Sequence, residues 1–126
     1  MRDLNEIKHI VNETIKKSDE FHKFLSKNKF KSDIKNNPGY TEDELKERRK
    51  LSEYLESFDD DTVLTIQAIM YLGRDGDYSN ESEVEAIISA KKKELGFATK
   101  EIEVNQMVSK APLSDYLKAG LKLLGL

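Results

Sequence analysis

The chain has 126 residues, of which 37% are hydrophobic and 36% charged, and its net charge of −3 suits one heavily charged globular domain with a real core. It contains no cysteine, which excludes disulfides, thiolate metal sites and cysteine nucleophiles. No stretch approaches the ~18 apolar residues of a membrane span, and the N-terminus has no apolar run typical of a signal peptide. We therefore expect a cytoplasmic protein that does not associate with membranes.

Three helices are predicted in the first 73 residues. Apolar residues spaced by three and four predict a helix over residues 4–27, and Asp3 with Glu6 forms a capping box. After a polar segment closed by Pro38-Gly39, a second helix opens at Thr41. Its expected buried residues are Leu45, Leu51, Tyr54, Leu55 and Phe58. The third helix starts at residues 59–62 and is apolar nearly all round. It is expected to be the central buried helix, ended by Gly73.

Three shorter helices are predicted in the rest of the chain. The fourth is capped by Ser79 or Asn80 and ends at Gly96-Phe97 in a pattern typical of a Schellman motif. Thr99 caps the fifth, with Ile102, Met107 and either Val104 or Val108 facing inward. Pro112 opens the last. The sequence thus predicts an all-α, compact single-domain bundle of about six helices over residues 1–126, with a helical pair in residues 1–58 and four helices in residues 59–126.

Charge is distributed unevenly along the chain. Residues 16–50 carry a net charge of +4, whereas residues 59–90 carry −7 and contain a single basic residue, Arg74. Two interpretations remain open: solvated helix surfaces of opposite sign that touch each other, or a polar binding face. On the second, the candidate protein-binding residues are Asp59, Asp60, Asp61, Arg74, Asp75, Asp77, Glu81 and Glu85. Such a face would suit a basic surface on a partner protein.

A basic region between the first two helices supports an alternative, nucleic-acid binding. Lysines and arginines contact phosphates, and an aromatic side chain stacks on a base. The candidate residues are Lys27, Lys29, Phe30, Lys31, Lys35, Arg48 and Arg49. Against this alternative, the isoelectric point is about 5.5 and acidic residues crowd the second helix.

Catalytic and metal chemistry find little support. His9 and His22 lie on one predicted helix, about 140° apart around its axis, so they do not converge. Asp75, Asp77 and Ser79 imitate the start of a calcium loop, but the glycine at position 6 and the glutamate at position 12 are missing. We expect no enzyme activity, no bound metal and no cofactor.

Two stretches carry a family resemblance. Residues 67–75 read Gln-Ala-Ile-Met-Tyr-Leu-Gly-Arg-Asp, and residues 112–121 read Pro-Leu-Ser-Asp-Tyr-Leu-Lys-Ala-Gly-Leu. Together they resemble a small bacterial helical domain family of unknown function, with a Leu-Gly-Arg motif and a Pro-Leu-x-x-Tyr-Leu-x-x-Gly-Leu motif. The likeness covers residues 60–125 and implies no activity, cofactor or partner. We predict that an ion pair between Arg74 and Asp115 ties the two motifs together.

The sequence favours a non-catalytic protein-binding module, since small charged helical proteins without site chemistry usually act by occupying a surface. The finer hypothesis is an inhibitor or regulator encoded by a phage or mobile element. The partner's identity and homo-oligomer formation remain open.

Overall fold

The computed structural model describes residues 2–27, 42–76, 83–109 and 113–126, and within these ranges it contains helices and no strand. The helices are α1 (Leu4–Lys27), α3 (Glu42–Glu56), α4 (Asp60–Asp75), α5 (Val84–Leu95), α6 (Lys100–Ser109) and α7 (Leu113–Leu123). The all-α prediction is confirmed, and each predicted helix has its counterpart.

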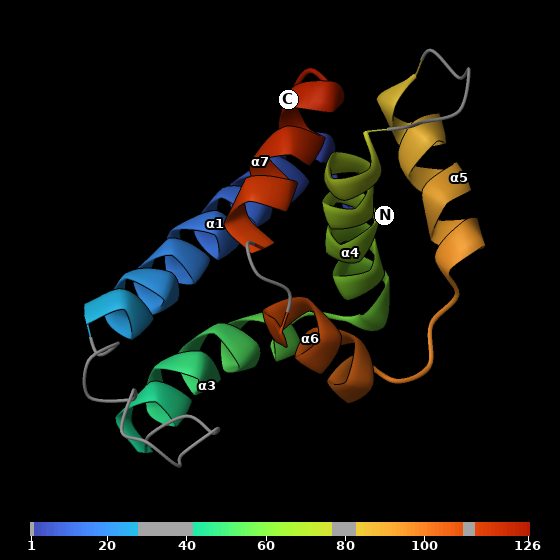
Figure 1. Ribbon diagram of the computed structural model, residues 1–126. Coiled ribbons are helices and arrows are strands. Elements are labelled where there is room, and N and C mark those ends of the chain that lie inside the picture. The colour runs from blue at the N-terminus through green and yellow to red at the C-terminus, as the bar shows by residue number, and fades with distance from the viewer. Residues whose placement is uncertain (1, 28–41, 77–82, 110–112) are drawn as a thin grey trace.

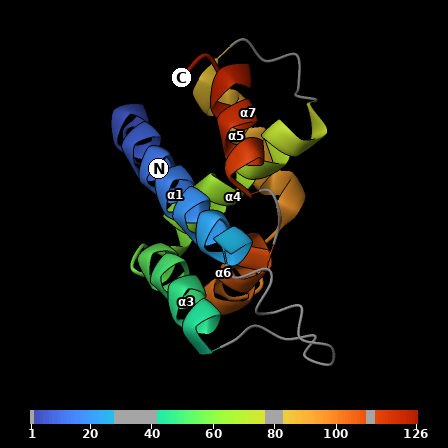
Figure 2. The same cartoon turned by 60° about the vertical axis from the view of Figure 1, so that its left-hand side comes forward.

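Helix α4 lies at the centre of the molecule, as its apolar sequence predicted. Helices α1 and α7 lie side by side and cover one side of α4, while α5 runs along another (Figure 1). Helices α3 and α6 pack together at one end of the molecule, at the bottom of the view in Figure 2. The middle of α4 is deeply buried, with exposures of at most 1% at Val63, Ile66, Ala68, Ile69, Met70 and Leu72. Burial of the apolar side chains of α4 is therefore a large part of the hydrophobic stabilisation of the fold.

Helices α4 and α7 approach each other closely where they cross, at two glycines. A methyl group added to Gly73 would lie 1.8 Å from the carbonyl oxygen of Tyr116 and 2.5 Å from the amide nitrogen of Gly120. A methyl group added to Gly120 would lie 2.2 Å from the carbonyl oxygen of Ile69. No side chain fits between these backbones, since real carbon atoms do not approach so closely. The two motifs of the sequence therefore meet in one helix crossing.

The prediction that Gly73 ends the central helix is wrong. The helix continues to Asp75, and Gly76 ends it with a left-handed backbone conformation (φ 65°, ψ 13°), its N–H donating to the carbonyl of Leu72 at 2.9 Å. Glycine is required at position 76 for its positive φ, whereas at position 73 it is required for close packing.

Local predictions at other positions meet mixed outcomes. Thr99 caps α6 as expected, accepting a hydrogen bond from the Ile102 N–H at 3.2 Å. The residue that precedes α5 is Glu83, not Ser79 or Asn80, which lie outside the described residues. Gly96 has φ 68° and ψ 177°, which is not the left-handed helical geometry of a Schellman motif.

Two expected core residues face solvent instead. Leu45 is 45% exposed and Ile102 is 47% exposed, whereas Glu44 and Glu103 beside them are buried. Leu51, Leu55 and Met107 are buried as predicted, so the difference is confined to the N-terminal part of each helix. There the adjacent residue, about 100° around the helix axis, faces inward in place of the expected one.

A buried polar contact joins α4 to α6. The Gln67 side-chain amide donates to the Glu103 carboxylate at 2.6 Å, and the other oxygen of that carboxylate accepts the Ala98 N–H at 3.2 Å. Gln67 is 3% and Glu103 8% exposed. A carboxylate so placed needs such donors, because burial without them is costly.

Candidate functional site

The candidate acidic residues do not form one continuous face. Asp59, Asp60 and Asp61 lie at the start of α4, whereas Arg74 and Asp75 lie at its end, about 22 Å away at 1.5 Å per residue. Glu85 is exposed in the first turn of α5. Asp77 and Glu81 lie outside the described residues. The structure thus divides the candidates between the two ends of a helix.

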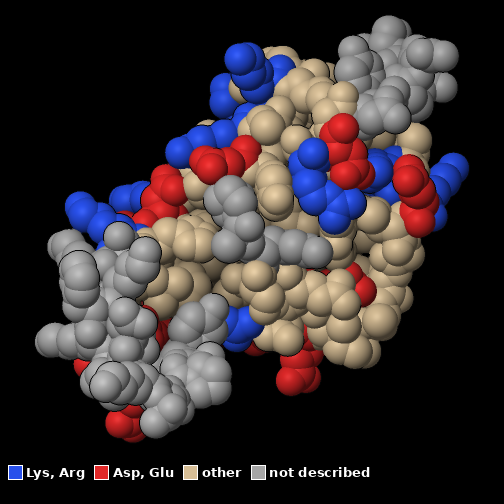
Figure 3. Space-filling view, in the orientation of Figure 1, with Lys and Arg blue, Asp and Glu red and all other residues tan. Residues whose placement is uncertain are grey.

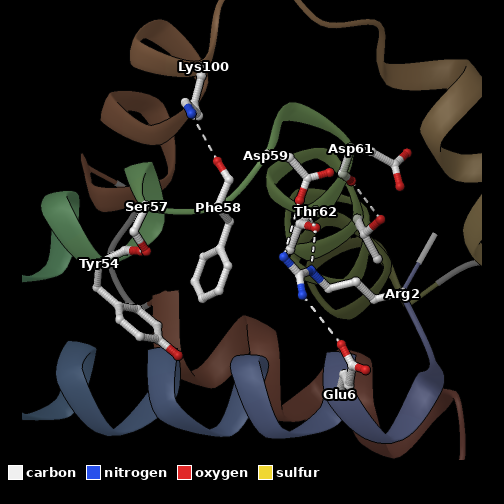
Figure 4. A network of polar contacts seen from close by, with 10 residues as sticks. Arg2, Glu6, Tyr54, Ser57, Phe58, Asp59, Asp61, Thr62 and Lys100 are labelled. Atoms are coloured by element: carbon white, nitrogen blue, oxygen red, sulfur yellow. Dashed lines mark hydrogen bonds and ion pairs between the residues drawn. The ribbon is translucent and has the colours of Figure 1, made fainter.

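At the start of α4, Asp59 is paired with Arg2 and Asp61 with Lys92. Arg2 donates from Nε to the Thr62 hydroxyl at 2.9 Å, and lies 3.5 Å from Asp59 (Figure 4). The hydrogen bond from the Thr62 hydroxyl is the largest cause that holds the pKa of Asp59 below its usual value; burial opposes it and the charge of Arg2 adds to it. Asp61 pairs with Lys92 of α5, whose hydrogen bond lowers the pKa of Asp61.

An apolar groove opens next to this network, between α1 and α3. Its volume is about 530 Å³, and Tyr54 and Phe58 extend from the end of α3 toward α1 (Figure 4). Their rings meet edge to face with centroids 5.1 Å apart. The groove is lined by Arg2, Asn5, Glu6, His9, Ile10, Tyr54 and Phe58. It holds His9, but none of the predicted binding residues.

At the end of α4, Arg74 is held on the surface by two contacts. Its guanidinium carbon lies 4.4 Å from the centroid of the Tyr71 ring, one helical turn earlier, and its Nε donates to Asp75 at 2.9 Å. The Arg74 side chain is nevertheless 39% exposed. A cation over an aromatic face and a charge-assisted hydrogen bond together fix the orientation of the guanidinium.

Asp75 is itself positioned by a second cation. The Nζ of Lys91, on α5, lies 3.4 Å from the other oxygen of Asp75 and 3.5 Å from Glu94. Lys91 is only 9% exposed. The hydrogen bond from Arg74 is the largest contribution that lowers the pKa of Asp75, and Lys91 adds to it. The cluster of Tyr71, Arg74, Asp75 and Lys91, here called the Arg74 cluster, is therefore an ordered chain of contacts.

The predicted ion pair between Arg74 and Asp115 is wrong. Arg74 bonds to its neighbour Asp75, and Asp115 is exposed in the first turn of α7 without any contact to Arg74 among the described residues. What ties the two motifs together is the glycine crossing of α4 and α7, because Gly73 and Gly120 bring the backbones together without any charged pair.

Sequence reasoning missed Tyr71 and Lys91. Tyr71 lies three residues before Arg74, a spacing that places two side chains on one face of a helix, so this partner was predictable. Lys91 lies on another helix, and no local pattern in the sequence connects it to Asp75.

Only some of the candidate nucleic-acid-binding residues lie within the described ranges. Lys29, Phe30, Lys31 and Lys35 lie outside the described residues, and Lys27 is the last residue of α1. Arg48 donates to Asn105 and to Ser109 of α6, both at 2.8 Å, while Arg49 is exposed. The structure thus uses Arg48 to join two helices. Side chains of opposite charge lie next to one another on the face in Figure 3, with no uniformly basic surface there.

Neither a cluster of metal-ligating side chains nor a helix able to span a membrane occurs in the described ranges. No group of three or more potential metal-ligating side chains occurs among those residues, although part of the loop after Asp75 lies outside them. In the same ranges, no helix has the length and apolar character needed to cross a membrane.

The described part of the chain is an all-helical domain in which Arg74 lies exposed at the end of the central helix. A family model described as "Protein of unknown function (DUF3775)" matches residues 48–126, and the chain belongs to this family. The match begins inside α3, earlier than the resemblance over residues 60–125 predicted, and contains both motifs and the Arg74 cluster. No curated protein and no solved structure matches the chain.

Proposed function

We propose that this chain is a non-catalytic protein-binding module of the cytoplasm, and that the Arg74 cluster is the centre of its contact surface. The observation that carries the proposal is the held but exposed guanidinium of Arg74, stacked on Tyr71 and oriented by Asp75. Arginine and tyrosine are enriched among the residues that dominate protein interfaces. An arginine fixed before binding loses little side-chain entropy when a partner docks.

Stability alone gives a poor account of this arrangement. Ion pairs between exposed side chains contribute little to folding, because water screens them and both side chains lose rotamer freedom. Adjacent residues on a helix also do not face each other, so the contact between Arg74 and Asp75 restricts both side chains. An orientation maintained without a gain in stability is what a recognition site requires.

The experiment is affinity capture from a lysate of the organism that encodes the chain. Wild-type protein, Arg74→Ala and the matched control Arg49→Ala, another exposed arginine, are compared with and without nuclease. We expect one protein partner that the control retains, that Arg74→Ala weakens at least ten-fold, and that nuclease leaves in place. Material lost on nuclease treatment and with Arg49→Ala would support nucleic-acid binding instead.

The finer hypothesis, an inhibitor or regulator encoded by a phage or mobile element, makes a further demand on the captured partner. Its activity should fall when stoichiometric wild-type protein is added and should be unaffected by Arg74→Ala. A partner whose activity does not respond would contradict inhibition while leaving the binding module intact.

A further inference from the structure

The Arg74 guanidinium leaves one of its edges open. Arginine has five N–H donors in a planar fork, and Asp75 takes the one on Nε. Tyr71 covers one face of the plane. Among the described residues, no acceptor contacts the two Nη nitrogens of Arg74. The edge formed by these nitrogens is therefore the part of the group that remains available for a ligand.

We infer that the open Nη edge of Arg74 binds a single carboxylate, from an aspartate or glutamate side chain of the partner protein. The two Nη nitrogens present parallel N–H groups, which match the two oxygens of a carboxylate in a bidentate pair. This inference rests on the proposed function and names the chemistry of the partner at the same site.

The charges around Arg74 favour one carboxylate over a run of acidic residues or a phosphate. Arg74 and Lys91 of the cluster are balanced by Asp75 and by Glu94, which contacts Lys91, so these four residues carry no net positive charge. A ligand must then be selected by the geometry of its hydrogen bonds instead of by its total charge. Two half-buried tyrosines, Tyr71 and Tyr116, belong to the same region, and Tyr116 contributes electrostatically to Arg74. Apolar residues beside the partner's carboxylate would suit these rings.

The partner inferred here contributes an acidic group, whereas the acidic stretch of the sequence suggested a basic partner surface. Asp61 is paired with Lys92, and Asp75 with Arg74 and Lys91, so both carboxylates already have cationic partners within the chain. Arg74 is the single basic residue of positions 59–90, and among the described residues its Nη edge has no acceptor, so this edge is open to a carboxylate of the partner.

The test uses defined peptides and nuclear magnetic resonance of the full chain. The probe Ac-Ala-Leu-Glu-Leu-Ala-NH2 is compared with its neutral isostere, in which glutamine replaces the glutamate, and with inorganic phosphate. The shift of the Arg74 Nε–Hε signal is followed during each titration. We expect a saturable shift with the glutamate peptide, binding at least ten-fold weaker with the glutamine peptide, and no saturation with phosphate over the same range.

Variants complete the test. Arg74→Lys keeps the charge and removes the fork, and it should weaken the glutamate peptide at least five-fold, followed through backbone amides of the last turn of α4. Arg49→Ala should leave binding unchanged. Equal binding of the two peptides, retention by Arg74→Lys, or saturation by phosphate would overturn carboxylate recognition. The capture experiment above is independent of these results, so a partner lost with Arg74→Ala would still support the binding module.

Discussion

Helices α7 and α6 are held to the rest of the molecule in different ways. α7 approaches α4 so closely that two glycine backbones touch, and its buried leucines, such as Leu117, complete the core. α6 also buries apolar side chains, but its contacts to α3 and α4 include specific polar side chains, among them Arg48 and Gln67. Both helices bury apolar side chains, but α7 additionally requires glycine at its crossing with α4, whereas α6 additionally requires polar side-chain contacts. Substitutions should therefore act differently on the two helices.

The largest effect is expected at the glycine crossing. Gly73→Ala or Gly120→Ala should lower the free energy of unfolding by about 3 kcal/mol or more, because the added methyl groups meet backbone atoms that cannot move without separating the helices. Urea denaturation followed by circular dichroism measures the change.

Gly76→Ala is the control for this prediction. An alanine there meets no atom within 4 Å, so its cost is only the left-handed backbone conformation, about 1 kcal/mol. Equal losses at positions 73 and 76 would mean that the crossing is looser than described.

A smaller effect is expected at the buried polar contact of α6. Gln67→Ala removes the donor to the nearly buried Glu103 carboxylate, which should cost about 2 kcal/mol. The exposed Gln106, on the same helix as Glu103, provides the comparison, and Gln106→Ala should be nearly neutral. If Gln67→Ala unfolds at the same urea concentration as the wild type, the polar contact between α4 and α6 contributes nothing to stability.

Arg48 tests the more exposed contact of α6, which it makes with α3. Arg48→Ala removes the hydrogen bonds to Asn105 and Ser109 and should cost about 1 kcal/mol, since these groups are accessible to water. Arg49→Ala, with the neighbouring exposed side chain, should not change thermal stability measurably. Losses of the same size in the two variants would argue that the charge of α3 matters more than its bonds to α6.

The smallest effect should come from acid. The pKa values of Asp59, Asp61 and Asp75 are lowered in the folded chain, chiefly by hydrogen bonds from Thr62, Lys92 and Arg74 respectively. The unfolded chain therefore binds more protons, and the stability these groups contribute is present above about pH 4 and lost as the pH falls through their folded values. Asp61→Asn should flatten the fall in melting temperature between about pH 4 and pH 2. An unchanged slope would show that Lys92 does not act on Asp61 in solution.

Much of the fold follows from local patterns. The spacing of apolar residues predicted each helix, and the nearly uniform apolar character of residues 63–72 predicted the central one, because those signals arise within the helix itself. Gly73 shows where such reasoning ends. A glycine near a helix terminus is explained equally well by a stop or by a neighbouring backbone, and only the position of α7 decides between them.

The site was less accessible to sequence reasoning for the same reason. Arg74 was singled out by its isolation among acidic residues, but its partner was assigned to another motif, whereas the structure uses the adjacent Asp75. Leu45 and Ile102 were assigned inward because they are apolar, yet the adjacent Glu44 and Glu103 are buried, Glu103 with a hydrogen bond from Gln67 of α4. Periodicity defines a helix face only to within about a residue when polar side chains are also buried.

The position of Lys91 links the proposed binding edge of Arg74 to the movement of helix α5. This lysine belongs to α5, a helix packed along one side of α4, yet it restrains Asp75 and through it Arg74. Peripheral helices open more often than central ones, which hydrogen exchange detects as faster loss of amide protection. Each opening of α5 would remove the Lys91 contact from Asp75 and so loosen one of the two contacts that orient the Arg74 guanidinium. The apparent affinity for a partner should then scale with the fraction of time that α5 is docked, so a substitution far from Arg74 that loosens α5 would weaken binding without touching the contact surface.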